Sequence, residues 1–114
     1  MTISHIKGAL AETLSTPSPV GSPIGEPVAH VSYKEWDRAD AVETGIWECT
    51  PGRWHRAVKD QEFCHFIAGA GTFTPTDGAP IAFKAGDAFM MSENTTGVWD
   101  IQETVRKTYV IIKR

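Results

Sequence analysis

Short apolar runs separated by turn-forming residues make up the chain from Val28 onward. Nine runs predict strands: Val28–Trp36, Ala41–Thr50, Arg53–Val58, Glu62–Ala68, Gly71–Pro75, Ile81–Lys84, Ala88–Met91, Gly97–Gln102 and Val105–Ile112. Predicted breaks include Gly69-Ala70, Glu103-Thr104 and Asp77-Gly78, the last a pair favoured in tight hairpins. No segment after residue 30 keeps a helical period, so the pattern predicts an all-β sandwich or barrel.

Residues 1–27 have a different pattern and are expected to form an arm outside the domain of residues 28–114. Near-helical spacing relates four apolar residues, although Gly8 lies among them: Ile3, Ile6, Leu10 and Leu14. Prolines at positions 17, 19, 23 and 27 then exclude a helix or a central strand. Two interpretations stay open, a disordered tail and an extended arm that lies across a partner subunit.

Composition narrows the function class without naming an activity. The length of 114 residues suits one domain with an ordinary core. A net charge of −3 without a basic run argues against nucleic acid as a partner. No apolar stretch is long enough to span a membrane, and the N-terminus does not resemble a signal peptide. We therefore expect a cytoplasmic protein whose two cysteines, Cys49 and Cys64, are reduced thiols.

Three motifs in order carry a family resemblance: Gly-Ile-Trp-Glu-Cys-Thr-Pro-Gly at 45–52, Glu-Phe-Cys-His-Phe-Ile-Ala-Gly at 62–69, and Gly-Asp-Ala-Phe-Met-Met at 86–91. Residues 97–100 and 105–111 complete the series. The order and spacing resemble small cupins of the ureidoglycine aminohydrolase-like and ethanolamine-utilisation branch, over roughly residues 28–113. The resemblance implies a jelly-roll or conical β-barrel with a pocket between its sheets. It also implies a homodimer.

The metal-binding pattern of that family is incomplete in this chain. Glu62 and Gly69 match the Glu and Gly of the family's first motif, and His55 stands where its first histidine belongs. Ala57 occupies the second histidine position, and Gly97 occupies the histidine position of the second motif. Because metal affinity depends on several imidazole and carboxylate ligands together, we expect no tightly held metal and no other cofactor.

Alternation along strands selects the candidate pocket residues. Glu62 shares a face with Cys64 and Phe66, so its carboxylate is expected to point into the apolar interior. A buried carboxylate needs a partner or a raised pKa, and a structural ion pair is the alternative to a site role. If position 97 faces inward, Trp99 does too, and its indole fills space that a metal would need.

Lys107 and Tyr109 share a face of the last predicted strand, where a lysine near Glu62 could orient an acidic or amide ligand. An exposed lysine beside a packed tyrosine is the alternative. Of the four tryptophans, at least two are expected in the core and others can line a pocket. The predicted ligand pocket has six residues: Trp47, His55, Glu62, Trp99, Lys107 and Tyr109.

Three functions are compatible with these residues. The first is a cupin that binds a small organic ligand in its barrel without a tightly held metal. The second is a hydrolase or lyase-type enzyme acting on a small amide, ureide or sugar-like substrate. In that enzyme Glu62 and His55 would act as acid and base or bind a divalent metal weakly. The third is a dimerisation or accessory subunit whose pocket has closed.

Overall fold

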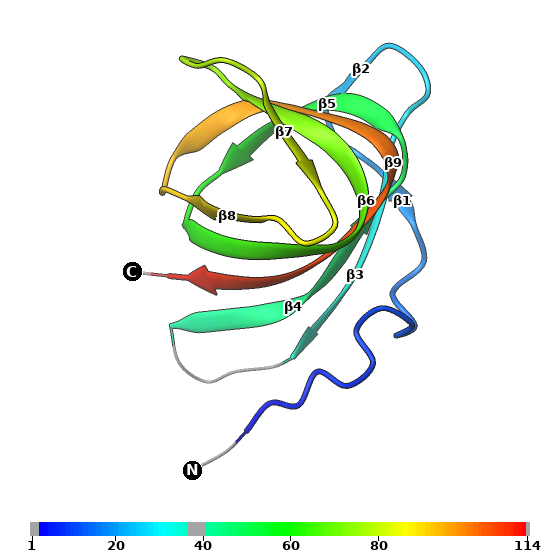
Figure 1. Cartoon of the computed structure of the whole chain (residues 1–114), viewed down its shortest axis with the longest axis vertical. Helices are drawn as coiled ribbons and strands as arrows, with labels where there is room; N and C mark the ends of the chain where they lie inside the picture. Colours follow the sequence, from blue (N-terminus) through cyan, green and yellow to red (C-terminus); the bar gives the residue numbers. More distant parts are fainter. Residues whose placement is uncertain (1–2, 37–40, 114) are drawn as a thin grey trace.

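The computed structural model describes residues 3–36 and 41–113, which form strands and connecting turns (Figure 1). The strands are β1 (Ser18–Pro19), β2 (Pro23–Ile24), β3 (His30–Trp36), β4 (Val42–Cys49), β5 (Gly52–Val58), β6 (Gln61–Pro75), β7 (Ile81–Lys84), β8 (Ala88–Met91) and β9 (Thr95–Ile112). The described residues include no helix, and so none that could cross a membrane. The predicted all-β class is confirmed.

Two long strands, β6 and β9, organise the barrel. One path of neighbours runs β1-β3-β4-β9-β5-β2, while β6 pairs with β7, β8 and β9, and every pairing is antiparallel. The first half of β9 pairs with β5 and its second half with β4. Because each long strand serves both halves of the sheet, the strands curl around a common interior, as Figure 1 shows.

The breaks predicted at Gly69-Ala70 and Glu103-Thr104 are wrong, because β6 and β9 run through them as continuous strands. The register between these strands shifts three times between Phe66 and Gly71 instead. Gly69 has φ of +87°, and a Cβ there would collide with the Thr104 carbonyl. The glycine therefore permits a bulge that bends the strand pair while the pairing continues on both sides.

The prolines confine the arm to the edges of the sheet. β1 pairs with β3 and β2 with β5, and these short strands are the two ends of the path. Edge pairing is what proline allows, because it lacks an amide donor. Residues 7–11 form turns rather than the helix that the spacing of Ile3, Ile6, Leu10 and Leu14 suggested.

The described part of the arm lies on the barrel of its own chain. Arg106, on the outer face of β9, holds it: Nη1 donates hydrogen bonds to the carbonyl oxygens of Ala9 and Glu12 at 2.8 and 2.9 Å. Nε of the same guanidinium donates to Glu48 Oε1 at 3.1 Å. The Arg106 side chain is 11% exposed, so this anchor is largely shielded from water.

The core is aromatic and lies between the two halves of the curled sheet. Phe66 stacks on Phe83 with ring centroids 4.1 Å apart, and Phe73 meets Trp99 edge-on at 4.7 Å. Trp54 and Trp99 are both buried, as expected for at least two tryptophans. Packing of this kind stabilises each aromatic pair by about 1 kcal/mol beyond the burial of its area.

Both cysteines are buried free thiols within this core. Burial raises the pKa of Cys49 to about 12 and also raises the pKa of Cys64. A thiol that stays protonated is a poor nucleophile. Cys64, whose exposed fraction is zero, is therefore a small core residue.

Candidate functional site

A cavity of about 200 Å³ opens on the inner face of the barrel. Residues from β3, β4, β5, β6 and β9 surround it. Its aromatic lining is Tyr33, Trp47, Trp99 and Tyr109. Its charged lining is Glu35, Glu43, Arg56, Glu62 and Lys107. Aromatic walls with a few converging polar groups are typical of small-molecule sites, and this volume lies below the ~300–1,000 Å³ of drug-sized ligands.

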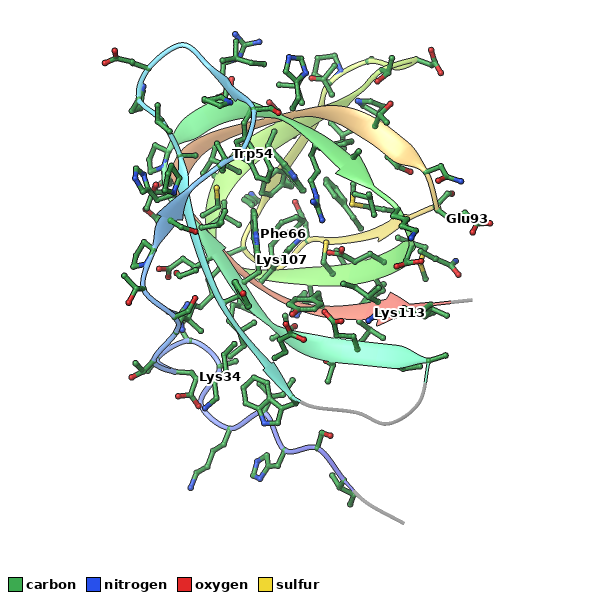
Figure 2. All side chains as sticks on the ribbon, turned by 180° about the vertical axis from the view of Figure 1, so that it is seen from behind. Lys34, Trp54, Phe66, Glu93, Lys107 and Lys113 are labelled. Atoms are coloured by element: carbon green, nitrogen blue, oxygen red, sulfur yellow. The ribbon has the colours of Figure 1, made fainter. Side chains whose placement is uncertain are left out.

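A buried ion pair stands in this cavity. Lys107 Nζ donates to Glu62 Oε2 at 2.9 Å, and the two side chains are only 7% and 6% exposed. Figure 2 shows Lys107 inside the curve of the sheet, near the labelled Phe66. Isolated buried charges are costly, and here each charge compensates the other.

The ammonium group of Lys107 is also held by two indoles. Nζ lies 4.4 Å from the ring centroid of Trp47 and 5.3 Å from that of Trp99. The two indoles are themselves in contact, with centroids 6.0 Å apart. A cation at this distance from indole faces is attracted by the ring quadrupole. Lys107 is therefore fixed on three sides, by one carboxylate and two tryptophans.

Strand alternation explains why these side chains meet. On β6, Glu62, Cys64 and Phe66 are buried while Phe63 and His65 are exposed. On β9, inward positions run from Gly97 through Trp99 to Lys107 and Tyr109 with the parity that the sequence predicted. Antiparallel pairing of β9 with β4 then sets Lys107 directly opposite Trp47.

Acidic side chains gather on the β3–β4 side of the cavity. Glu35 lies on β3 and Glu43 on β4, beside Tyr33 and Tyr109. The pKa of the Tyr109 hydroxyl is raised first by burial, then by the negative charges of Glu43, Glu35 and Glu62. The strand β5, which pairs with the first half of β9, contributes Arg56 to the same lining. The lining thus takes Glu35 and Glu43 from one half of the sheet and Arg56 from the other.

Five of the six predicted pocket residues line this cavity, and His55 does not. On β5 the inward positions are those of Trp54 and Arg56, so the exposed His55 lies on the opposite face. The prediction for His55 is therefore wrong. Arg56 was missed although its parity with Trp54 could have identified it. Glu43 was missed too, although it shares its parity with Trp47 on the same predicted strand. Glu35 and Tyr33 had no comparable signal, because only the pairing of β3 with β4 brings them to the cavity.

The cavity does not fit the metal centre that metal-binding cupins carry. No imidazole lines it, and Lys107 already occupies the nearest Glu62 oxygen. At the family's later histidine position, a Cβ on Gly97 would meet the Thr74 carbonyl and would lie 2.6 Å from the Phe73 ring. Within residues 3–36 and 41–113, no group of three His, Cys, Asp or Glu side chains is placed to hold a metal ion.

Comparisons with solved structures support the fold. The Clostridium difficile EutQ protein superposes with a TM-score of 0.71 at 15% identity, over 87% of this chain and 81% of that one. A putative ethanolamine utilization protein Q from Salmonella typhimurium gives 0.67 at 14% identity, over 90% and 98%. A DUF861-family protein of unknown function from Pseudomonas syringae gives 0.72 at 24% identity, over 87% of this chain but 43% of that one.

Sequence comparison gives the family itself. A search among curated proteins found no match. The family profile of the EutQ-like cupin domain matches residues 37–109, which is more than half of the chain. The resemblance seen in the motifs and the jelly-roll fold agree with this match. The chain belongs to the EutQ-like cupin domain family.

Proposed function

We propose that this cupin binds a small organic ligand in its barrel cavity without a tightly held metal. The observation that carries the proposal is the cavity of about 200 Å³, walled by Trp47, Trp99 and Tyr109 around the buried Lys107–Glu62 pair. An accessory domain whose pocket has closed would fill this space with side chains, whereas here a cavity lies beside the ion pair. The donor set favours organic recognition, because an ammonium group stands beside the carboxylate.

The enzyme alternative receives less support from the geometry. It paired Glu62 with His55 as acid and base, and the two side chains lie on opposite faces of the barrel wall. Proton transfer needs the two groups within hydrogen-bond reach of one substrate. Ligand binding therefore remains the function that this cavity supports best.

A ligand screen tests the proposal. Wild-type protein would be mixed with small carboxylic acids, amines, amides, amino acids and sugars, and the thermal midpoint and tryptophan fluorescence recorded. A compound that binds only the folded state raises the thermal midpoint. At a hundredfold excess over Kd it adds about 2.7 kcal/mol to the free energy of unfolding. Hits should also change the emission of Trp47 and Trp99, which face the cavity.

Matched tryptophan variants locate the binding. Trp47→Leu removes a cavity wall, whereas Trp36→Leu changes a half-buried tryptophan of β3 outside the lining. Hits should bind Trp47→Leu at least tenfold more weakly and Trp36→Leu as they bind wild type. A screen without hits, or equal binding to all three proteins, would overturn the proposal. Near-stoichiometric Mn, Fe, Ni or Zn in untagged protein would overturn its metal-free part.

We also infer that the chain forms a homodimer. Phe63 and Met90 are paired across β6 and β8 and are 40% and 59% exposed on the outer face. Apolar side chains gathered on one face support an interaction surface. Light scattering coupled to size exclusion should give twice the chain mass for wild type and the monomer mass for Met90→Lys. A monomeric wild type at all concentrations would contradict this inference.

A further inference from the structure

The charged residues of the cavity come from two different parts of the sheet. Glu35 and Glu43 come from β3 and β4, and β4 pairs with the second half of β9. Arg56 comes from β5, which pairs with the first half of β9. The curl of the sheet brings these two carboxylates and the guanidinium to the lining of one small space, from separate halves of the sheet. A ligand with a single charge would meet attraction at one side and repulsion at the other.

The buried ion pair of Lys107 and Glu62 adds no net charge to the cavity. Lys107 donates to Glu62, and its remaining surface faces Trp47 and Trp99. Its positive charge is therefore compensated within the protein. Outside this pair, the charged groups of the lining are those of Glu35, Glu43 and Arg56. Glu43 also pairs with Lys113 at 2.9 Å, so the lining together with this lysine has no net formal charge.

The acidic side keeps a negative field despite the nearby lysine. Glu43 and Glu35 both raise the pKa of the Tyr109 hydroxyl, which lies among them. Tyr33 and Tyr109 add aromatic surface at the same place. Carboxylates together with aromatic rings attract an ammonium group, by charge and by the ring quadrupole. A guanidinium such as that of Arg56 recognises a carboxylate through paired N–H donors.

We propose that the ligand of this cavity is a small free amino acid. Its ammonium group lies at the Glu35–Glu43 side and its carboxylate meets Arg56. This inference rests on the proposed function, since it names the ligand class of the same cavity. An amino acid carries one positive and one negative charge and is neutral overall, which matches a lining that carries both signs without a net charge. The cavity volume of about 200 Å³ restricts the ligand to a small amino acid.

Titration calorimetry with probes that isolate each charge tests the assignment. The probes are glycine, β-alanine and γ-aminobutyrate, which separate the two charges by increasing lengths, against ethylamine, propionate and propionamide. At least one amino acid should bind, and the single-charge and neutral probes should bind at least tenfold more weakly. Charge-assisted hydrogen bonds contribute about 1.5–3 kcal/mol, which corresponds to about 10- to 150-fold in Kd.

Matched variants connect the binding to the two sides. Arg56→Gln and Glu35→Gln should each weaken the amino acid at least tenfold. Arg53→Gln is the control, because Arg53 lies on the same strand but on the outer face, in an exposed pair with Asp100. Both charge variants should keep the wild-type thermal midpoint without ligand, since Arg56 and Glu35 are exposed.

The outcomes separate this inference from the proposed function. Ethylamine or propionate binding as tightly as every amino acid would overturn the amino acid assignment and leave a ligand site. So would hits from the wider screen with no amino acid among them. An amino acid that binds all variants and wild type alike would place the ligand elsewhere and overturn the assignment. No binding by any compound, in the probes or in the screen, would overturn both.

Discussion

The buried pair of Lys107 and Glu62 gives a quantitative test of how this interior is held together. Lys107→Met leaves the Glu62 carboxylate without the ammonium group that pairs with it, and Glu62→Leu leaves that ammonium group beside the indole faces without the carboxylate. Both side chains are less than a tenth exposed, so little water reaches the partner that is left behind. The double variant removes both charges and leaves an apolar pair of similar volume.

The expected magnitudes follow from this burial. Breaking a buried pair by removing one partner costs about 3–5 kcal/mol, whereas replacing both charges by packed apolar groups is often neutral. Each single variant should therefore lose about 3 kcal/mol, and the double variant less than either. The coupling energy is then at least about 3 kcal/mol. In a chain of 114 residues a loss of 3 kcal/mol lowers the thermal midpoint by about 12 °C.

Urea unfolding followed by tryptophan fluorescence would measure all four proteins. Unchanged m-values would show that stability, rather than compactness, differs among them. Additive losses, or single variants within about 1 kcal/mol of wild type, would refute the reasoning, because the pair would then be solvated. A confirmed cycle would identify Glu62 as a structural carboxylate as well as a cavity group, so substitutions of Glu62 alone could not isolate ligand binding.

Three further predictions use other parts of the barrel. Cys49→Ala should remove part of the decline in stability above pH 9. The thiol has a pKa near 9.0 in the unfolded chain and about 12 in the folded protein, so the wild type loses about 1.4 kcal/mol per pH unit between these two pH values. Arg106→Gln should release the arm, since the two hydrogen bonds to Ala9 and Glu12 are lost, and speed tryptic cleavage after the exposed Lys7. Gly97→Ala should cost about 1–3 kcal/mol in urea unfolding, because its Cβ would overlap the Phe73 ring.

Each of these predictions has its own control. The sign for Cys49 follows from its raised folded pKa: stability is complete below pH 9, and an unchanged slope in the variant would contradict the assignment. Arg53→Gln removes only an exposed pair at 3.9 Å and should leave cleavage at Lys7 unchanged. Gly21→Ala adds a Cβ in open space, so equal losses for it and Gly97→Ala would contradict the close contact.

Much of the barrel could be predicted from the sequence because strand alternation is a local property. The period of two predicted an inward Glu62 and grouped Lys107 with Tyr109 on one face, and in the structure all three are buried. The same period, applied to β5, would have put Arg56 inside and His55 outside. His55 was selected from the family's motif instead. Because this chain departs from that motif, the motif position does not show on which face of the strand His55 lies.

Other features required the assembled sheet. The sequence predicted a turn at Gly69, because glycine is favoured in turns and in β-bulges alike. Only the continued pairing of β6 with β9 shows that this position is a bulge. The prolines of residues 17–27 excluded a helix locally, but the edges on which β1 and β2 pair are set by β3 and β5.

The sequence by itself determined the class of fold, the family pattern with its missing histidines, and the face of most strand residues. These depend on residue types and on a two-residue period, which act over short distances. Only the tertiary structure decided that Lys107 meets Glu62, that two indoles hold its ammonium group, and that Glu35, Glu43 and Arg56 line one cavity. Those contacts join strands far apart in the chain, and their geometry depends on the register and curvature of the whole sheet.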